Sequence, residues 1–411
     1  MTSAVPTVVD HELLREVWEG RRGLPSEAFV DEQWFAAEVA SLVSPHWMCI
    51  ALEDDVAGAG DLHPVTLAGM PLVVARGKDG RIRVFHNVCS HRGSQLVDEP
   101  QCGAARISCP YHQWMFGLDG ALEHTPHAGG FKVHHAAKAP KDELGLREVR
   151  SAAWNGFVFV NLDGAAVPFE EHIAPTAERL TPVDFSRFRH DRALDAGYVL
   201  QSNWKTIVEN FVESYHVPPV HPELQKFNPM SAHFQILGGH AYAGQGGTAY
   251  GAADNPEPMP GDGLPVMQGI VDMPWSYESL YCFPNFVIAP IENMAFVLLA
   301  FPQSAGVTTE RLCFFFYGDE AMSAPLASER QAVADAIVQV NLEDIGIVER
   351  CQRGRHSPAF VGGVFMPQQE KTSLLVQQVF AGRMLEHLGD AVDFSVLPWE
   401  DIFHERHGEP D

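Results

Sequence analysis

The spacing of hydrophobic residues changes twice along the chain. Between Asp10 and His46 apolar side chains, Trp18 and Trp34 among them, recur every three to four positions, which predicts helices. Beyond Trp47 the apolar runs are short and alternating, and turn residues such as those at 78–80 separate them, which predicts antiparallel strands. We expect this strand-rich part to end near Asp163.

The remainder of the chain mixes both patterns. Helices are predicted over 169–180, 203–215 and 323–353, and the apolar runs at 285–290, 293–301 and 311–317 predict strands of a larger antiparallel sheet. Residues 238–263 are rich in Gly, Pro, Asn and Asp and are expected to form one long loop. The fold class is therefore α+β, in three parts: helical residues 1–46, a strand-rich domain at 47–163, and a larger domain at 164–411.

The chain is strongly acidic. Its 28 Lys and Arg stand against 53 Asp and Glu, which gives a formal net charge of −25. This balance argues against nucleic acid or an anionic membrane as a partner, and it favours a basic protein or a cationic small molecule. We find no signal peptide and no apolar run of membrane-spanning length, and the seven cysteines are scattered. We therefore expect a cytoplasmic protein with reduced thiols.

Four metal-binding side chains lie in and just after the predicted helix at 203–215. Glu209, Glu213 and His216 stand at i, i+4 and i+7, on one helical face, where two like charges need a compensating cation. Two prolines then end the helix, so the chain can turn and bring His221 back towards His216. Two histidines with a distant carboxylate suit a mononuclear Fe(II) site. The alternative is a solvated helix end with incidental histidines.

A second set of donors lies in the strand-rich part. Cys89-x-His91 is followed, after 17 intervening residues, by Cys109-x2-His112. Two thiolates and two imidazoles can hold a tetrahedral zinc ion or a Rieske [2Fe–2S] cluster. The Rieske cluster is favoured because the flanking strands leave no helix of the kind a zinc finger needs. Cys102 has no histidine at matching spacing and is interpreted as a structural or free thiol.

The two motifs together resemble those of the catalytic α subunit of Rieske non-haem iron oxygenases, the aromatic-ring-hydroxylating oxygenase family. The resemblance covers about residues 47–355. The matching motifs are Cys89-x-His91…Cys109-Pro-Tyr-His112-x-Trp114 and Asn203-Trp204-Lys205…Glu209-Asn210-x2-Glu213-x2-His216-x4-His221-Pro222. Gln113 departs from the pattern, since many relatives carry glycine there. The resemblance implies an antiparallel Rieske [2Fe–2S] domain inserted into a helix-grip catalytic domain, to which residues 1–46 then belong.

The resemblance also implies the ligands. Cys89, His91, Cys109 and His112 would bind the [2Fe–2S] cluster, and His216 and His221 would bind the mononuclear Fe(II). The third ligand to Fe(II) is assigned to Asp344. Helical periodicity supports this choice, because Asp344 shares a face with apolar residues whereas Glu343 is rotated away by about 100°. The alternative for Asp344 is an ordinary charged residue on a solvated helix.

Glu213 occupies the position of a carboxylate that, in the family, links a Rieske histidine of the neighbouring subunit in a homotrimer to a histidine of the mononuclear iron. A glutamate here resembles the choline, carnitine and betaine oxygenase branch, because most ring-hydroxylating members have aspartate. Glu209 shares the predicted face of Glu213, and it either tunes the site or has a structural role. Both glutamates are therefore catalytic candidates.

These parts predict the terminal component of an oxygenase system that hydroxylates a small organic substrate with O2. The sequence contains no Gly-x-Gly-x-x-Gly motif and no plant-type ferredoxin cysteines, so we expect electrons from a separate NAD(P)H-dependent reductase or a ferredoxin. A Rieske-type electron carrier or a zinc protein without oxygenase activity is a distant alternative. It would not need His216, His221 and Asp344 together.

The acidic chain and the glutamate at 213 favour an N-methylated quaternary ammonium substrate, demethylated after hydroxylation next to nitrogen. Aromatic rings in the region 275–296 could form a cation–π cage for such a substrate, or they could be core residues of the sheet. The rings in question are Trp275, Tyr277, Tyr281, Phe283, Phe286 and Phe296. The alternative function is hydroxylation of an aromatic ring or aromatic acid, as a monooxygenase or a dioxygenase.

Overall fold

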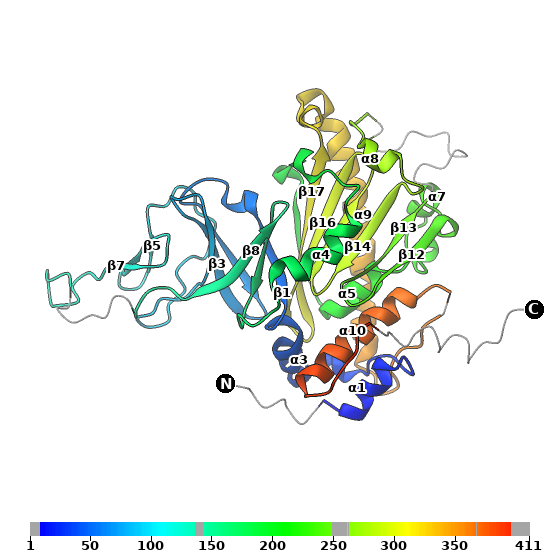
Figure 1. Ribbon diagram of the computed structural model, residues 1–411, viewed down its shortest axis with the longest axis horizontal. Coiled ribbons are helices and arrows are strands. Elements are labelled where there is room, and N and C mark those ends of the chain that lie inside the picture. The colour runs from blue at the N-terminus through cyan, green and yellow to red at the C-terminus, as the bar shows by residue number, and fades with distance from the viewer. Residues whose placement is uncertain (1–8, 136–142, 249–260, 262, 367, 396–411) are drawn as a thin grey trace, which may run out of the picture. The chain divides into compact units, whose positions relative to one another are not determined.

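The computed structural model describes residues 9–135, 143–248, 261, 263–366 and 368–395 (Figure 1). The chain folds into two compact units. Residues Ser44–Ala166 form one unit, and Met1–Val43 with Val167–Asp411 form the other, so the first unit is inserted into the sequence of the second. Within the described ranges, no helix combines the length and the apolar character that crossing a membrane requires.

The inserted unit is built from two antiparallel sheets. The larger has the strand order β1-β9-β8-β4-β3-β2 and the smaller β5-β6-β7. The strands are β1 Trp47–Leu52, β2 Leu62–Leu67, β3 Met70–Arg76, β4 Ile82–His86, β5 Ile107–Ser108, β6 Met115–Phe116, β7 Leu122–His124, β8 Glu148–Trp154 and β9 Phe157–Asn161. The strands predicted around 65–67, 72–74 and 82–85 are confirmed. A shared apolar core that includes Phe85, Phe116 and Ile107 also contains Cys89 and Cys109, so the core anchors both cysteine loops.

The larger unit contains an antiparallel sheet of eight strands in the order β10-β17-β16-β15-β14-β13-β12, with β11 also paired to β17. These strands are β10 Phe188–His190, β11 Ala196–Leu200, β12 His233–Gly238, β13 Tyr242–Gly247, β14 Tyr277–Cys282, β15 Phe286–Pro290, β16 Met294–Ser304 and β17 Val307–Tyr317. The predicted apolar runs therefore form central strands. The two longest, β16 and β17, form a hairpin in which most residues are buried.

Helices complete this unit. They are α1 His11–Trp18, α2 Glu27–Val30, α3 Glu32–Glu38, α4 Phe169–Arg179, α5 Trp204–Phe211, α6 Val217–Val220, α7 Leu224–Phe227, α8 Gln268–Val271, α9 Ala327–Arg355 and α10 Lys371–His387. The helices predicted before His46, at 169–180 and at 323–353 are confirmed. The long helix α9 packs against α5 and β11, where Ile207, Val348 and Leu200 meet in a small apolar cluster.

The N-terminal helices are tied to α5 by a buried ion pair. Lys205 Nζ lies 2.5 Å from Glu38 Oε1, and both side chains are almost fully buried. The same ammonium donates to the main-chain oxygen of Ala28 at 2.6 Å. A buried charge needs such partners, so removing one of them leaves the other uncompensated. The early helices therefore belong structurally to the larger unit.

The predicted helix at 203–215 is shorter than expected. Asn203 caps its start by accepting from the Lys205 N–H, but the helix ends at Phe211. The Glu213 carboxylate accepts from the main-chain N–H groups of Tyr215 and His216, which holds residues 213–216 in a turn. Glu209, Glu213 and His216 therefore do not share a helical face. The two prolines, which fit the first turn of a helix, begin α6 instead of only ending α5.

The loop predicted over 238–263 is partly a strand. Tyr242–Gly247 forms β13, which pairs with β12 on one side and β14 on the other. Its glycines hide the strand pattern in the sequence. Glycine is required at 244, because a Cβ there would lie 2.0 Å from the main-chain oxygen of Ser279. Residues 249–260 and 262 of the predicted loop lie outside the described residues.

Candidate metal centres

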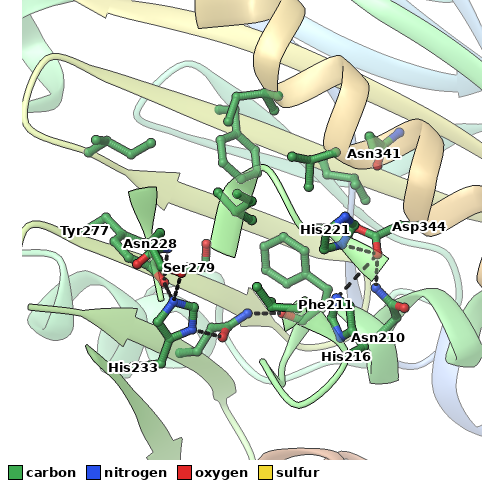
Figure 2. A pocket seen from close by; sticks show the side chains of 18 of the residues that line it. Asn210, Phe211, His216, His221, Asn228, His233, Tyr277, Ser279, Asn341 and Asp344 are labelled. Carbon is green, nitrogen blue, oxygen red and sulfur yellow. Dashed lines mark hydrogen bonds and ion pairs between the residues drawn. The ribbon is translucent and has the colours of Figure 1, made fainter. Parts of the chain in front are cut away.

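His216, His221 and Asp344 come together at the end of α6. One ligand atom from each lies within 4.8 Å of the other two. His221 Nε2 is 2.9 Å and His216 Nε2 is 3.4 Å from Asp344 Oδ1. Figure 2 shows both imidazoles turned towards this carboxylate. The grouping of two histidines with a distant carboxylate, which the sequence predicts, is therefore present in the fold.

Local structure explains how the two histidines meet. His216 directly precedes the single turn of α6 and His221 directly follows it, so one short helix presents both rings. The ring centroids are 5.1 Å apart and the rings are nearly perpendicular. Asp344 reaches them from the middle of α9. The site is thus assembled from two segments that lie 123 residues apart.

Each histidine is held by a second carboxylate on its outer nitrogen. His216 Nδ1 lies 2.5 Å from Glu213 Oε1, and His221 Nδ1 lies 2.7 Å from Glu343 Oε2. A proton on each Nδ1 satisfies these contacts and leaves each Nε2 lone pair directed at the centre of the site. Metal-binding histidines in proteins are commonly oriented in this way.

Glu343 is a site residue that the sequence analysis missed. Helical rotation places Glu343 about 100° from Asp344, as predicted. His221 nevertheless contacts both carboxylates, one with each ring nitrogen. The signal that could have found Glu343 is the general need of a ligating histidine for a partner on its other nitrogen. Asn210 was also missed, and its Nδ2 donates to Asp344 Oδ1 at 2.8 Å.

The electrostatics of this cluster favour a cation. Burial lowers the pKa of His221, but the Asp344 and Glu343 carboxylates outweigh burial and raise the pKa above its ordinary value. The two carboxylates therefore favour a positive charge on the ring of His221 or beside it. Two imidazoles and one carboxylate that converge in this way fit Fe(II) with open coordination positions.

The structure does not bring Glu209 to this site. Its carboxylate accepts from Arg355 at 2.8 Å and from Gln377 at 2.7 Å, which links α5 to α9 and α10. Glu209 was expected either to tune the site or to have a structural role, and the geometry favours the structural role. The two glutamates separate because α5 ends between them.

A second cluster of donors lies away from the first, where His190, Asp195 and Cys313 approach within 4.8 Å. Here Asp195 already pairs with Arg311 through one oxygen at 2.8 Å and with His190 through the other at 2.8 Å. The guanidinium supplies the positive charge, so this cluster is satisfied without a metal.

In the inserted unit, the two predicted loops bring their cysteines and histidines together. Cys89 and Cys109 are buried, the His91 and His112 rings are 4.7 Å apart, and Trp114 stacks on His91 at 4.6 Å. Burial raises the pKa of Cys89. Burial acts in the same direction on Cys109, but the main-chain N–H groups of residues 112 and 111 bring its pKa below the ordinary value. Amide groups aimed at sulfur are a feature of iron–sulfur sites, where they tune the potential.

An unsatisfied atom supports a metal at these loops. His112 Nδ1 is buried and has no hydrogen-bond partner among the described residues. A buried imidazole nitrogen in this state is costly unless something else binds it, and iron of a [2Fe–2S] cluster would do so. Cys102 is exposed and takes no part. Gln113 has φ +56°, in the left-handed region, which explains why glycine suits this position.

A cavity of about 120 Å³ opens beside the mononuclear site. At one end it is bounded by His216, His221 and Asp344, and polar side chains including His233 and Tyr277 line the other end (Figure 2). Between them the walls are apolar. Among the described residues that line the cavity, none is Lys or Arg.

Most of the aromatic residues predicted as a possible cage are core residues. Tyr277 and Phe296 line the cavity, and Phe211, which the sequence analysis did not select, joins them. The other four rings are buried but do not line it; they are Trp275, Tyr281, Phe283 and Phe286. Three rings therefore remain available for contact with a cationic substrate.

A Rieske-type cluster unit joined to a helix-grip unit with a two-histidine, one-carboxylate site defines an oxygenase of the Rieske non-haem iron class. Comparison with protein families agrees. Residues 184–386 match the ring hydroxylating alpha subunit (catalytic domain), and residues 46–136 match the Rieske [2Fe-2S] domain. The chain belongs to the family of Rieske oxygenase α subunits, whose cofactors are a [2Fe–2S] cluster and a mononuclear iron.

Curated relatives are oxygenase components. The chain is 28% identical over 351 residues to the carnitine monooxygenase oxygenase subunit of Escherichia coli K12, covering 85% of this chain and 87% of the relative. It is 32% identical over 206 residues to the glycine betaine monooxygenase oxygenase subunit of Chromohalobacter salexigens, covering 50% and 44%. It is 33% identical over 220 residues to the salicylate 5-hydroxylase large oxygenase component of Ralstonia sp., covering 51% of each.

Solved structures show the same fold. The quaternary ammonium Rieske monooxygenase CntA in complex with L-carnitine matches with a TM-score of 0.72 at 21% identity, over 92% of this chain and 98% of that one. Naphthalene 1,2-dioxygenase from Rhodococcus sp. matches with a TM-score of 0.71 at 19% identity, over 92% and 96%. The α+β fold class predicted from the sequence is confirmed.

Proposed function

We propose that this oxygenase hydroxylates a C–H bond next to the nitrogen of an N-methylated quaternary ammonium compound. The observation that carries the proposal is the convergence of His216, His221 and Asp344 on the wall of a cavity without Lys or Arg among its described lining residues. A site of this kind attracts a cation to the carboxylate-rich end where oxidation takes place.

In this proposal residues 47–163 form the Rieske domain, and residues 1–46 with 164–411 form the catalytic domain. Cys89, Cys109, His91 and His112 hold the [2Fe–2S] cluster, and His216, His221 and Asp344 hold Fe(II). When bound, these centres supply O2 activation and the storage of two electrons. The electrons come from a separate NAD(P)H-dependent reductase, directly or through a ferredoxin.

The carboxylates around the site have distinct tasks. Glu343 holds the Nδ1 proton of His221, and Asn210 fixes Asp344 by donating to it. Glu213 holds the Nδ1 proton of His216 and, in a homotrimer, would link that histidine to a Rieske histidine of a neighbouring subunit. Its proposed role is therefore both to orient a ligand and to carry the path of the electrons.

The substrate class rests on three supports. Two sets of curated relatives are named for carnitine and glycine betaine. The rings of Phe211, Phe296 and Tyr277 line the cavity and can attract a quaternary ammonium through their faces. Asp344 and Glu213 place negative charge at the metal end.

The reaction balances with one O2, two electrons and two protons. One oxygen atom enters the C–H bond next to nitrogen, and the other becomes water. The resulting N–C–OH group loses its C–N bond, so a hydroxylated methyl group leaves as formaldehyde. A hydroxylated chain methylene instead leaves as an aldehyde and releases trimethylamine.

The second candidate is hydroxylation of an aromatic acid. The similarity to a salicylate 5-hydroxylase component over half of the chain favours it. The absence of Lys and Arg from the described cavity lining opposes it, because an aromatic acid carries a carboxylate without any positive charge of its own and needs a cationic partner when buried.

One experiment separates the candidates. The iron-loaded protein is supplied with a surrogate reductase and NADH, and O2 consumption is measured with a panel of trimethylammonium compounds and of aromatic acids. We expect formaldehyde or trimethylamine in a 1:1 ratio to O2 with the first group. Hydroxylated aromatic acids formed in that ratio, with no reaction of the ammonium compounds, would reject the proposal.

A further inference from the structure

The end of the cavity opposite the iron ligands is polar, and we call it the polar wall. It consists of Asn228, His233, Gln245, Tyr277 and Ser279, which line the cavity together. Figure 2 labels four of them, Asn228, His233, Tyr277 and Ser279. None of these residues has a role in holding iron. Hydrogen bonds join Gln245, His233, Tyr277 and Asn228 into a chain, and the donor of each bond can be identified atom by atom.

The chain of hydrogen bonds begins at two main-chain oxygens. Gln245 Nε2 donates to the carbonyls of Phe211 and Glu213 at 3.2 and 3.1 Å, so the orientation of this amide is fixed. Its Oε1 therefore faces His233 Nδ1, 3.2 Å away, as an acceptor. The proton of the His233 ring consequently lies on Nδ1.

The chain continues through a tyrosine. Burial lowers the pKa of His233, so at neutral pH the ring is uncharged and its Nε2 accepts. The Tyr277 hydroxyl, 3.2 Å from Nε2, donates to it. The main-chain oxygen of Asn228 also lies 3.2 Å from Nε2, but an acceptor cannot bond to an unprotonated nitrogen. Asn228 Nδ2 then donates to the Tyr277 oxygen at 2.9 Å, which fixes the Asn228 amide as well.

One acceptor is left over at the end of this chain. Asn228 Oδ1 is buried, Asn228 is only 4% exposed, and the oxygen has no partner among the described residues. A Cβ on Gly247 would clash with the Tyr277 ring and lie 3.1 Å from this oxygen, so only glycine lets the ring and the Asn228 amide pack against the strand here. A buried acceptor without a partner is costly, and a ligand that donates to it removes that cost.

We infer that the polar wall binds a hydrogen-bond donor of the substrate, a hydroxyl or an amide N–H, at Asn228 Oδ1. The inference rests on the proposed function and narrows it to quaternary ammonium alcohols or amides. A bare carboxylate is disfavoured, because it would face an acceptor oxygen in a cavity whose described lining includes no Lys or Arg. The Ser279 hydroxyl on the same wall can donate to the substrate oxygen in return.

The test is isothermal titration of the full-length, iron-loaded protein with three matched ligands. They are a trimethylammonium alcohol, the alkyl compound in which a methyl group replaces the hydroxyl, and the carboxylate of equal chain length. We expect the alcohol to bind about tenfold or more tightly than either of the others. In Asn228→Leu the preference of the alcohol over the alkyl compound should disappear. In the control Leu298→Val, a cavity residue without polar atoms, both affinities should shift together and the preference should remain.

The outcomes separate this inference from the proposed function. Carboxylate binding as tight as alcohol binding in the unmodified protein, an unchanged preference in Asn228→Leu, or no binding of any of the three overturns the inference. Turnover is followed in parallel through formaldehyde and trimethylamine. Coupled turnover without alcohol preference rejects the inference alone, and alcohol preference without any turnover rejects the proposed reaction alone.

Discussion

The two proposed metal centres differ in which histidine nitrogen is available to a metal. At the mononuclear site the Nδ1 atoms of His216 and His221 contact carboxylates, and the Nε2 atoms point to the centre. At the Rieske loops the buried nitrogen without a described partner is Nδ1 of His112, while His91 is exposed. Carboxylates thus hold the histidines of the mononuclear site. The Rieske loops instead present the imidazole of His91 to the surface of their unit, which suits electron transfer to another protein.

The centres also differ in how they are assembled. The Rieske donors lie in two neighbouring loops of one small core. The mononuclear site needs α6 and a residue 123 positions away on α9. A local site depends on its loops, whereas a remote site depends on the packing of the whole unit. Substitutions that remove one centre should therefore spare the other.

The largest expected effect is that of Asp344→Ala. Loss of the carboxylate that both histidines face should abolish binding of the mononuclear iron and all turnover. The visible absorbance of the Rieske cluster should persist, because its loops belong to the other unit. Iron and acid-labile sulfide are measured per chain, with Cys102→Ser as a control that keeps both centres. Full turnover in Asp344→Ala would refute the assignment.

Glu213→Gln separates electron transfer from metal binding at the mononuclear site. The amide keeps an acceptor for His216 but loses the charge. We expect both metal centres to be retained and coupled turnover to fall by about 10- to 100-fold. Single-turnover reduction of the cluster followed by product analysis measures this. Wild-type rates would show that Glu213 is no link between the centres.

Glu343→Ala tests the role of Glu343, which helical periodicity did not identify as a site residue. Without its carboxylate the Nδ1 proton of His221 loses its acceptor, and we expect Fe(II) affinity to fall by about 10- to 100-fold. The cluster absorbance should not change. Glu349→Ala, further along α9, is the matched control. Equal Fe(II) affinity in the two variants would mean that Glu343 does not orient His221.

A smaller effect concerns pH. The carboxylates raise the pKa of His221, so in the metal-free protein the ring keeps its proton to a higher pH than a free histidine. Fe(II) must displace this proton. Its affinity should therefore be highest above the raised pKa and fall as pH drops through it, by at most about tenfold per pH unit for one proton. Fe(II) titrations between pH 6 and 8 measure this, and an affinity that rises towards acid would contradict it.

The smallest expected effect is that of Gln113→Gly in the Rieske loops. Glycine relieves the strain of a positive φ but gains freedom in the unfolded chain, so the stability of the unit should change by less than about 1 kcal/mol. Thermal unfolding followed by cluster absorbance is the measurement. A larger loss of stability would indicate a contact of the Gln113 side chain that matters more than its backbone.

Much of this architecture could be predicted from the sequence because the signals are local. The Cys-x-His and Cys-x2-His spacings predict one set of donors, and the run around His216 and His221 predicts the other. The predictions that were wrong concern features that depend on tertiary structure. The end of α5 at Phe211 follows from the hydrogen bonds of the Glu213 carboxylate, and the glycines of β13 hide a strand that only its neighbours define.

The missed site residues share a physical cause. Glu343 and Asn228 act through side chains brought to them by distant segments, and neither lies in a pattern that spacing can identify. A helical wheel gives the direction of Glu343 but not the position of His221. The proposed role of Asn228 can be inferred only from the hydrogen-bond chain through Tyr277 and His233.

The most direct test of the central claim is the ratio of product to O2 in the iron-loaded protein with a surrogate reductase and a trimethylammonium substrate. We expect one formaldehyde or one trimethylamine for each O2 consumed, and no such product in Asp344→Ala. Consumption of O2 that is independent of every ammonium compound tested, or product formation that survives Asp344→Ala, would contradict it.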